Sequence, residues 1–340
     1  MNIYSLTKKQ LENYFESINQ KKYKAKQVYD WLYKKRVKSF DDMTNIKKEV
    51  IEKLKEDFTI DTPKIIKVQN GKNVHKFLFN LNDNEKVEAV LMNHDYGNSL
   101  CVSTQVGCNM GCKFCESGRL KKRRNLEVYE MVTQIQLIEE KTNIRISHVV
   151  LMGIGEPFDN FENIINFIDI INDDNGLAIG ARHITVSTCG IVPKIREFTK
   201  MHSQVNLAIS LHAPNDEIRS KIMKINKIYP IKDVIDSIKD YLKENNRKVT
   251  FEYIMLKGIN DSKENAIELS NLLKGLNAYV NLIPYNETSN IGFEASSKDV
   301  IMKFYDTLKK CNIKVTIRKE FGTGIDAACG QLRSKYEEEI

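Results

Sequence analysis

The stretch GCNMGCKFCESG, residues 107–118, decides the fold class that we predict for this chain. It spaces Cys108, Cys112 and Cys115 as C-x3-C-x2-C on one short loop, and its glycines let the backbone turn tightly. Three thiolates this close in sequence can converge on one metal centre. Iron–sulfur cubanes normally take four thiolates, so three leave one iron open for a substrate or cofactor. The loop therefore predicts a cluster with an open coordination position.

The same spacing is compatible with two plainer structures. The thiolates could belong to a zinc site completed by a distant residue, or they could be buried thiols without a metal. No fourth Cys or His lies within a few residues of the loop, which disfavours a closed local zinc site. The chain has seven cysteines, and this odd number argues against a disulfide scaffold. Two of the others, Cys189 and Cys311, are interpreted as structural.

Around the loop, the hydrophobic pattern alternates between strands and helices. Helix-like stretches such as ENIINFIDIIN (162–172) and SKENAIELSNLLK (262–274) separate seven apolar runs. This alternation predicts repeated βα units on a parallel sheet, either open and doubly wound or closed into a full or partial barrel. The seven strand-like runs cover residues 99–105, 148–153, 183–187, 205–211, 248–256, 279–285 and 314–319.

The first part of the chain is predicted to form two further units. Apolar residues recur at helical spacing over residues 1–62, which indicates a small helical accessory domain. Residues 63–97 alternate like short strands, with a hairpin turn at LNDNE (81–85), and lead into a core domain over residues 98–340. The first sixty residues hold 14 Lys and Arg against 9 Asp and Glu, so they carry most of the excess positive charge.

The composition is that of a globular protein. Of 340 residues, 41% are hydrophobic and 29% are charged, which excludes a disordered, collagen-like or low-complexity chain. The formal net charge of +7 is compatible with a polyanionic partner. The apolar runs are too short to span a membrane, and the first fifteen residues lack the apolar segment of a secretion signal. We therefore expect a cytoplasmic protein that does not bind membranes.

Polar side chains follow four of the predicted parallel strands. In barrels of parallel strands, chemistry gathers at the carboxyl ends of the strands, so these residues should share one rim. The set consists of Gly155 and Glu156 after the second run, Ser187 at the end of the third, Ser210 and His212 at the end of the fourth, and Asn286 after the sixth.

These motifs resemble a known family. C-x3-C-x2-C with an aromatic residue before the last cysteine, here Phe114, is the radical S-adenosylmethionine (radical SAM) signature. A wider series of motifs, nearly spanning the chain, resembles the RNA adenine methyltransferases of the RlmN/Cfr group. The resemblance implies a partial (βα) TIM-type barrel of the radical SAM class with a small N-terminal helical accessory domain. The motifs are QVGCNMGCKFC (105–115), MGIGEPFDN (152–160), ITVSTCGIVP (184–193), LAISLHAPND (207–216), NLIPYN (281–286) and IDAACGQL (325–332).

The resemblance also implies cofactors and their ligands. It places one [4Fe-4S] cluster on Cys108, Cys112 and Cys115, and it implies two molecules of S-adenosyl-L-methionine (SAM) per turnover. Glu156 can accept hydrogen bonds from the ammonium of SAM, while backbone amides can hold its carboxylate. The residues that the resemblance assigns to the SAM pocket are Gly155, Glu156, Ser187, Ser210, His212 and Asn286.

Three further residues carry catalytic roles by resemblance. Cys329 accepts a methyl group from one SAM, and a 5′-deoxyadenosyl radical from the second SAM removes hydrogen from that methyl. The carbon radical adds to adenine, Glu88 removes the ring proton, and Cys101 frees the product by thiolate exchange, which leaves a Cys101–Cys329 disulfide. Radical chemistry suits carbon 2 of adenine, which is not nucleophilic enough for direct transfer from a sulfonium. Without the resemblance, Glu88 would be interpreted as a surface residue of a strand.

The implied function is methylation of carbon 2 of a specific adenosine in 23S rRNA, with tRNA left open as a second substrate. Glu156-Pro157 favours this branch, since the C8-methylating branch associated with antibiotic resistance typically carries Glu-Ala there. The implied partners are these RNAs and an electron donor such as flavodoxin or ferredoxin, and we expect a monomer. The alternatives are C8 methylation and a non-catalytic, zinc-containing RNA-binding protein.

Two basic stretches are candidates for RNA contact. Residues 119–124 hold five cations, and the lysines and arginines of residues 21–38 alternate with aromatic residues. Charge interleaved with aromatics can hold phosphates and stack bases, although solvated helix faces show the same pattern. The resemblance places RNA across both stretches. The interleaved aromatic residues are Tyr23, Tyr29, Trp31 and Tyr33.

Overall fold

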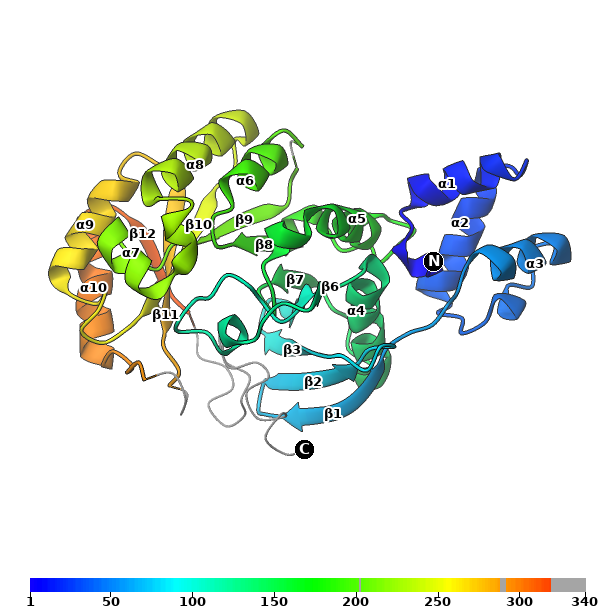
Figure 1. Cartoon of the computed structure of the whole chain (residues 1–340), viewed down its shortest axis with the longest axis horizontal. Coiled ribbons are helices and arrows are strands. Elements are labelled where there is room, and N and C mark those ends of the chain that lie inside the picture. The colour runs from blue at the N-terminus through cyan, green and yellow to red at the C-terminus, as the bar shows by residue number, and fades with distance from the viewer. Residues whose placement is uncertain (202, 288–291, 319–340) are drawn as a thin grey trace.

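The computed structural model describes residues 1–201, 203–287 and 292–318 (Figure 1). Its centre is one ten-stranded sheet in the order β1-β2-β3-β4-β7-β8-β9-β10-β11-β12. A separate two-stranded sheet pairs β5 (Gln105–Val106) with β6 (Arg124–Asn125). The strands of the large sheet are β1 (Lys64–Asn70), β2 (Val74–Asn80), β3 (Lys86–His94), β4 (Gly97–Cys101), β7 (His148–Leu151), β8 (Ile184–Thr188), β9 (Asn206–Ser210), β10 (Val249–Met255), β11 (Ala278–Pro284) and β12 (Lys314–Ile317).

The seven strands from β4 to β12 are the parallel strands predicted from the sequence. Each is hydrogen-bonded to the next along the chain, in parallel. The order never reverses, as it would in a doubly wound sheet, so the arrangement is a barrel type. Among the described strands, β1 and β12 form the two edges of the sheet, and the barrel is therefore partial.

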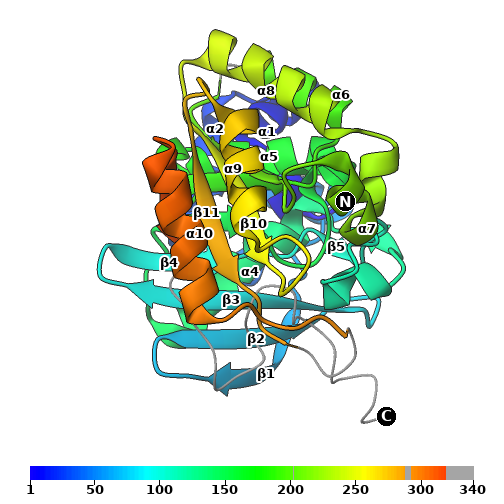
Figure 2. The same cartoon turned by 90° about the vertical axis from the view of Figure 1, so that its left-hand side faces the viewer.

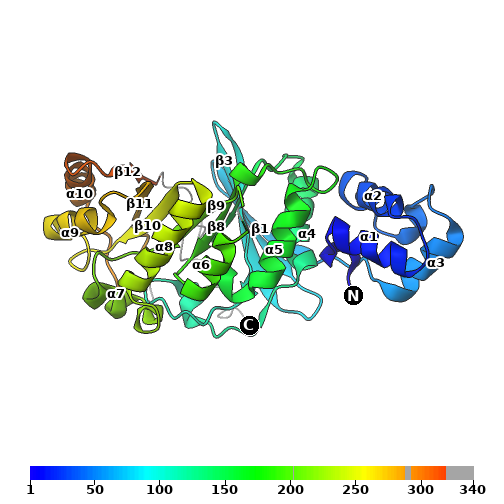
Figure 3. The same cartoon turned by 90° about the horizontal axis from the view of Figure 1, so that it is seen from above.

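Helices cover the outside of this parallel sheet (Figures 2 and 3). Right-handed crossovers between sequential parallel strands place their helices on one face. The opposite, concave side and the carboxyl ends of the strands are left for a site. The helices of the core are α4 (Val128–Thr142), α5 (Phe161–Asn172), α6 (Val192–Thr199), α7 (Asp216–Ile222), α8 (Ile231–Asn245), α9 (Lys263–Leu273) and α10 (Lys298–Lys310).

The sequence patterns explain both kinds of element. In β9, residues 207–209 are each at most 1% exposed, which is the continuous burial of a parallel strand covered on both faces. Helix α8 instead buries one stripe, with Val234, Ile238 and Tyr241 at i, i+4 and i+7, and it ends at Asn246 in the left-handed conformation. Of the helices described, none has the length and apolar character needed to cross a bilayer.

Strands β1 to β3 continue the barrel sheet as an antiparallel extension. Strand β3 pairs antiparallel with β4, with Val90 opposite Cys101, and β4 pairs parallel with β7. The turn between β2 and β3 contains Asn84 at a φ of 65°, which fits the predicted hairpin. The residues of β3 are therefore carried to the edge of the barrel, next to Cys101.

The N-terminal unit packs beside α4, away from the rest of the barrel (Figures 1 and 3). Its side chains Tyr29, Trp31 and Tyr33 belong to the hydrophobic core and are at most 8% exposed, whereas Tyr23 is 58% exposed. The prediction that these aromatics stack on bases is therefore wrong for three of the four. The helices of this unit are α1 (Lys8–Ser17), α2 (Tyr23–Tyr29), which continues into a π-helical turn at Asp30–Lys34, and α3 (Lys48–Asp57).

Glu139 on α4 is a buried link between the N-terminal unit and the barrel. Its carboxylate forms an ion pair with Arg36 of the N-terminal unit. It also accepts hydrogen bonds at 2.8 Å from the Arg145 guanidinium and from the backbone N–H of Ile146. The Glu139 side chain is only 3% exposed, so water has little access to the place of its carboxylate and replaces this acceptor poorly when it is removed.

We predict that Glu139→Ala lowers the free energy of unfolding by about 2–3 kcal/mol, because three donors lose a buried acceptor. The neighbouring Glu140 is a matched control, since its ion pair with Lys38 at 2.8 Å is exposed on both sides. Glu140→Ala should cost less than about 1 kcal/mol. Urea titrations followed by circular dichroism measure both values, and equal losses would contradict the role given to Glu139.

Candidate functional site

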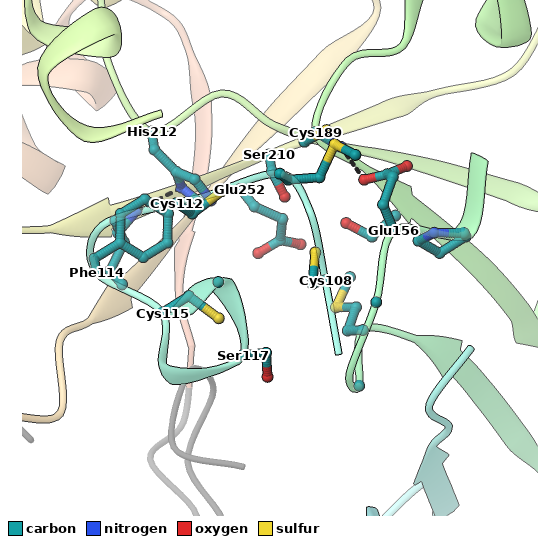
Figure 4. A pocket seen from close by; sticks show the side chains of 18 of the residues that line it. Cys108, Cys112, Phe114, Cys115, Ser117, Glu156, Cys189, Ser210, His212 and Glu252 are labelled. Atoms are coloured by element: carbon teal, nitrogen blue, oxygen red, sulfur yellow. Dashed lines mark hydrogen bonds between the residues drawn. The ribbon is translucent and has the colours of Figure 1, made fainter. Parts of the chain in front are cut away.

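A cavity opens at the carboxyl ends of the parallel strands (Figure 4). It holds about 900 Å³ of space not filled by protein, part of it open to solvent, which is within the size range of small-molecule sites. Strand ends form one side of it, and the cysteine loop forms the other. The lining residues that carry polar or sulfur groups include Cys108, Cys112, Cys115, Ser117, Glu156, Ser187, Cys189, Ser210, His212, Glu252 and Arg318.

The cysteine loop is fixed by backbone contacts on both sides. Cys108 donates its N–H to the carbonyl of Leu120 at 3.0 Å, and Cys112 forms an antiparallel bridge with Met223. Gly107 has a φ of +76°, and a Cβ at this position would lie 2.2 Å from a backbone oxygen. A larger residue would therefore displace the loop. The backbone thus holds the three cysteines around one end of the cavity, as Figure 4 shows.

The arrangement of the thiols suits a multi-iron cluster better than a single ion. In the described part of the chain, no three His, Cys, Asp or Glu side chains converge closely enough to hold one metal ion. In a cubane, each thiolate binds a different iron, so the ligands stand apart around a larger body. Cys108, Cys112 and Cys115 all line the same cavity in this way (Figure 4).

Electrostatics lead to the same conclusion. Burial raises the pKa of the Cys108 thiol to about 12 and that of Cys112 well above its ordinary value. The Cys115 thiol and Glu156 raise both pKa values further, because negative charges repel one another. Positive charge between the thiols therefore favours the ionised forms of Cys108 and Cys112. An iron core supplies that charge, and thiolates are the form that binds it.

Glu156 is a buried residue of the cavity wall and anchors two backbone segments. Its carboxylate accepts hydrogen bonds from the N–H groups of Phe158 at 3.1 Å and Cys189 at 2.8 Å. Burial raises its pKa, and these hydrogen bonds act in the opposite direction. Each carboxylate oxygen can accept more than one hydrogen bond, so Glu156 can still bind a cation in the cavity. The preceding Gly155 has a φ of +112°, and a side chain at this position would collide with those of Thr104 and Gln105.

His212 offers the cavity a neutral donor. Its Nδ1 accepts the backbone N–H of Ile254 at 3.1 Å, which places the ring proton on Nε2. Burial, and then the positive charge of Arg219, lower the pKa of His212 to about 3. The ring also packs edge-on against Phe114 with centroids 4.9 Å apart. At neutral pH the imidazole is therefore uncharged and fixed in orientation.

The remaining residues assigned to SAM by resemblance divide into two groups. Ser187 at the end of β8 and Ser210 at the end of β9 line the cavity. Asn286 lies two residues beyond β11 and is not among the described residues that line the cavity. The structure thus brings five of the six residues together and leaves Asn286 outside the described wall.

The sequence analysis does not identify two charged residues of the cavity wall, Glu252 and Arg318. Glu252 on β10 is buried, and its carboxylate accepts a hydrogen bond from the Asn281 amide on β11 at 2.9 Å. Burial raises the pKa of Glu252, while the charge of Arg318 lowers it. A signal was present in the sequence, because Glu252 is the one charged residue in the strand VTFEYIM. A charge within a strand covered on both faces needs a buried partner or a ligand.

Cys101 lies next to the cavity on the neighbouring strand β4. It packs in a small apolar cluster with Val90 of β3, and Met152, which lines the cavity, packs against the same cluster. The predicted partner Cys329 lies outside the described residues, so the structure does not test the Cys101–Cys329 pair.

Glu88 lies on the same face of the sheet as Cys101. It precedes Val90 by two residues, and Val90 is directly opposite Cys101, so all three side chains share one face. Glu88 is 1% exposed, and its carboxylate lies 3.2 Å from the ammonium of Lys76. The interpretation of Glu88 as a surface residue is therefore wrong, and the ammonium fixes the position of a buried carboxylate.

The basic run 119–124 is largely neutralised within the chain. Four of its five cations form ion pairs, and Arg124 binds the buried Glu130 through two nitrogens. Only the exposed cations of this run therefore remain candidates for contact with phosphates. The pairs, with their N–O distances, are Arg119–Glu116 (3.6 Å), Lys122–Asp159 (2.7 Å), Arg123–Glu85 (2.6 Å), Arg124–Asp83 (2.7 Å) and Arg124–Glu130 (2.7 Å).

Comparisons with known proteins agree with this geometry. Residues 102–270 match the model of the radical SAM superfamily, and residues 1–60 match that of the ribosomal RNA large subunit methyltransferase N-terminal domain. The first match contains the cysteine loop and the strand ends from β7 to β10. The second contains the basic helical unit beside α4.

Relatives extend the match over the whole chain. A protein of Spiroplasma citri described as a probable dual-specificity RNA methyltransferase RlmN is 53% identical, over 98% of both chains. A protein of Enterococcus faecalis with the same description is 54% identical, over 98% of this chain and 96% of its own. The crystal structure of a radical SAM methyltransferase from Sphaerobacter thermophilus is 38% identical, with a TM-score of 0.91, over 98% of this chain and 99% of the other.

The cavity geometry predicts that Cys112→Ala loses iron. Removal of a ligand should lower the affinity by at least the roughly 10–100-fold that loss of a partner behind a ligand costs. Cys311 is a matched control, because it is an exposed cysteine at the end of α10. Iron and sulfide analysis after anaerobic reconstitution should find Cys311→Ala loaded like the unmodified chain. Full loading of Cys112→Ala would show that the loop does not hold the cluster.

Proposed function

Because the chain belongs to the RlmN family of radical SAM RNA methyltransferases, we propose that it methylates carbon 2 of a specific adenosine in 23S rRNA and also acts on tRNA. The observation that carries this proposal is the loop of three cysteines facing a cavity at the carboxyl ends of parallel strands. A [4Fe-4S] cluster needs such a loop, and the open iron needs a cavity in which SAM can bind beside it.

The cofactors and the protein have separate tasks. When bound, the [4Fe-4S] cluster and SAM supply the radical chemistry that an unreactive ring carbon requires. The chain holds the cluster through Cys108, Cys112 and Cys115. It surrounds the remaining space with groups at the ends of four strands, and it excludes water from them by burial, which strengthens each polar contact.

The cavity wall matches the polar parts of SAM. We assign the ammonium to Glu156, whose buried carboxylate is already oriented by two backbone N–H groups. The hydroxyls of Ser187 and Ser210 and the Nε2–H of His212 are donors that can orient the carboxylate and the ribose. Asn286 stays in this assignment because it follows a strand of the same rim.

We propose that Glu88 and Cys101 act on the nucleotide. Both side chains are on one face of β3 and β4, and Met152 of the cavity wall packs against the cluster that contains Cys101. Glu88 would remove the ring proton, with Lys76 holding its carboxylate in place. Cys329 would carry the methyl group as a thioether, and attack by Cys101 on its sulfur would release the product and leave a disulfide.

The substrate RNA would be held by exposed cations and the N-terminal unit. Lys121 and Arg119 are exposed beside the cysteine loop, and Lys21 and Lys26 are on the N-terminal unit, where Tyr23 is also exposed. Phosphate contacts of this kind position RNA without reading its sequence. We propose that the chain acts as a monomer, divided at residues 62 and 97 as predicted, and takes electrons from flavodoxin or ferredoxin.

The role of Cys101 predicts a trapped complex. In Cys101→Ala the thioether between Cys329 and the RNA cannot be resolved, so an RNA–protein adduct should accumulate and turnover should fall at least about 100-fold. Denaturing gels with labelled RNA detect the adduct. It should disappear when Cys329 is also replaced, and it should be absent in Cys189→Ala, which removes another buried thiol. Normal turnover by Cys101→Ala would rule out this role.

The target atom is tested by product analysis. Ribosomal RNA and tRNA from cells lacking the enzyme, after reaction and digestion, should contain 2-methyladenosine, because the motif at 156–157 is that of the C2 branch. Chromatography with mass spectrometry separates it from 8-methyladenosine. Replacement of Cys329 by Ala is the negative control. If only 8-methyladenosine is found, the C8 branch is correct, and if neither is found in tRNA, the second substrate is withdrawn.

A further inference from the structure

Arg219 on α7 is a fully buried cation beside the cavity, with an exposed fraction of 0%. Its guanidinium donates hydrogen bonds to five oxygens, and all five are neutral. Hydrogen bonds to neutral oxygens satisfy the donors without cancelling the charge. The acceptors are the carbonyls of Cys189 (2.6 Å), Leu211 (3.1 Å), Tyr229 (3.2 Å) and Ser210 (3.4 Å) and the amide oxygen of Asn226 (2.8 Å).

A buried cation normally has a paired anion, because an isolated charge in the interior is costly. Among the residues that the structure describes, the acidic side chains near Arg219 do not form an ion pair with it. Asp216 on the same helix is exposed, and its carboxylate accepts the backbone N–H of Ile231. Glu156 lies on the other side of Cys189, where it accepts the Cys189 N–H while Arg219 binds the Cys189 carbonyl. We therefore expect the anion that balances the positive charge of Arg219 to bind in the cavity.

The position of Arg219 ties it to the cysteine loop. The segment that follows it in the chain is hydrogen-bonded to that loop, since Lys113 donates its N–H to Ile222 at 2.9 Å and Cys112 is bridged to Met223. The guanidinium therefore lies behind the wall that carries the cysteine loop, outside the cavity itself.

We propose that the buried charge of Arg219 makes the cluster held by Cys108, Cys112 and Cys115 easier to reduce. The proposal rests on the proposed function. In the reduction, one electron passes from the external donor to the iron core and adds one negative charge to it. A fixed positive charge in a water-poor interior stabilises that added charge, and net charge around a cluster is one of the factors that set its potential.

The sharpest test supplies the missing anion and leaves Arg219 in place. Asn226 Oδ1 already accepts from the guanidinium at 2.8 Å, so Asn226→Asp puts a carboxylate of the same shape there, at the loss of the amide N–H bonds to the Ser220 hydroxyl (2.8 Å) and the Asp216 carbonyl (3.3 Å). We expect the equilibrium constant for one-electron reduction to fall about tenfold, which is a shift of 59 mV to more negative potential. A dithionite titration of the anaerobically reconstituted protein, followed by electron paramagnetic resonance, measures it.

The control is Asn265→Asp in the first turn of α9. It adds the same charge at a surface position, where the side chain accepts the N–H of the helix cap, Ser262. Because exposed charges are screened by water and salt, the potential should stay at the value of the unmodified chain. A shift in Asn226→Asp that Asn265→Asp does not show supports the proposal.

A second pair of variants separates charge from hydrogen bonding. Arg219→Lys keeps the charge and loses most of the donors, whereas Arg219→Gln loses the charge. We expect the potential of Arg219→Lys to stay near that of the unmodified chain and that of Arg219→Gln to fall as in Asn226→Asp. If Arg219→Gln does not fold, Arg219→Lys and Asn226→Asp still decide the question.

Two results would overturn the proposal. One is a potential that does not move in Asn226→Asp when iron content is retained, and the other is an equal shift in Arg219→Lys and Arg219→Gln. Either result would mean that Arg219 only connects α7 to the ends of the neighbouring strands through its hydrogen bonds. Failure of the unmodified chain to bind iron is a different result, since it contradicts the proposed function itself.

Discussion

Three half-buried thiols on one loop repel one another when they are ionised, unless positive charge lies among them, and this constraint governs the structure around the cavity. The loop is fixed at Gly107 and at the bridge between Cys112 and Met223, so the thiols cannot move apart to relieve their repulsion. The apolar side chain of Phe114 keeps water away from them. Such a loop is stable with a cationic iron core and poorly suited to any state without one.

The order of the strands determines which other residues lie around that loop. Because β4 to β12 follow one another without reversal, their carboxyl ends form one curved rim. Ser187, Ser210 and Glu252 come to that rim from three consecutive strands. The antiparallel strand β3 then brings Glu88 to the edge of the barrel. The groups that we propose for the cofactor and those that we propose for the nucleotide thus lie on adjacent parts of one sheet.

The parallel half of the fold could be predicted because its signals are local. Runs of apolar residues such as 206–210 mark strands that are buried on both faces, and the helices between them show one apolar stripe. The extension of the sheet by β1 to β3 was not evident from the same pattern, since strand pairing is set by contacts between distant residues. Only the structure shows that β3 lies against β4.

Side-chain environments were harder to predict than elements. The sequence shows a run of cations at 119–124, but their partners Asp83, Glu85 and Asp159 come from other parts of the chain. Without the family resemblance, the pattern around Glu88 indicates a surface residue, because burial on a sheet depends on what covers it. Ser187, Ser210 and His212 could be predicted because each lies at or just after the end of a strand, whereas Glu252 lies in the middle of one and gives a weaker signal.

The central claim is that three cysteines hold a cluster with one iron open to SAM. Electron paramagnetic resonance of the anaerobically reconstituted and reduced protein, recorded with and without SAM, tests it most directly. The account predicts a [4Fe-4S] signal that changes when SAM is added, because SAM binds at the open iron. A colourless protein with bound zinc and no such signal, or a cluster signal that SAM leaves unchanged, would contradict it.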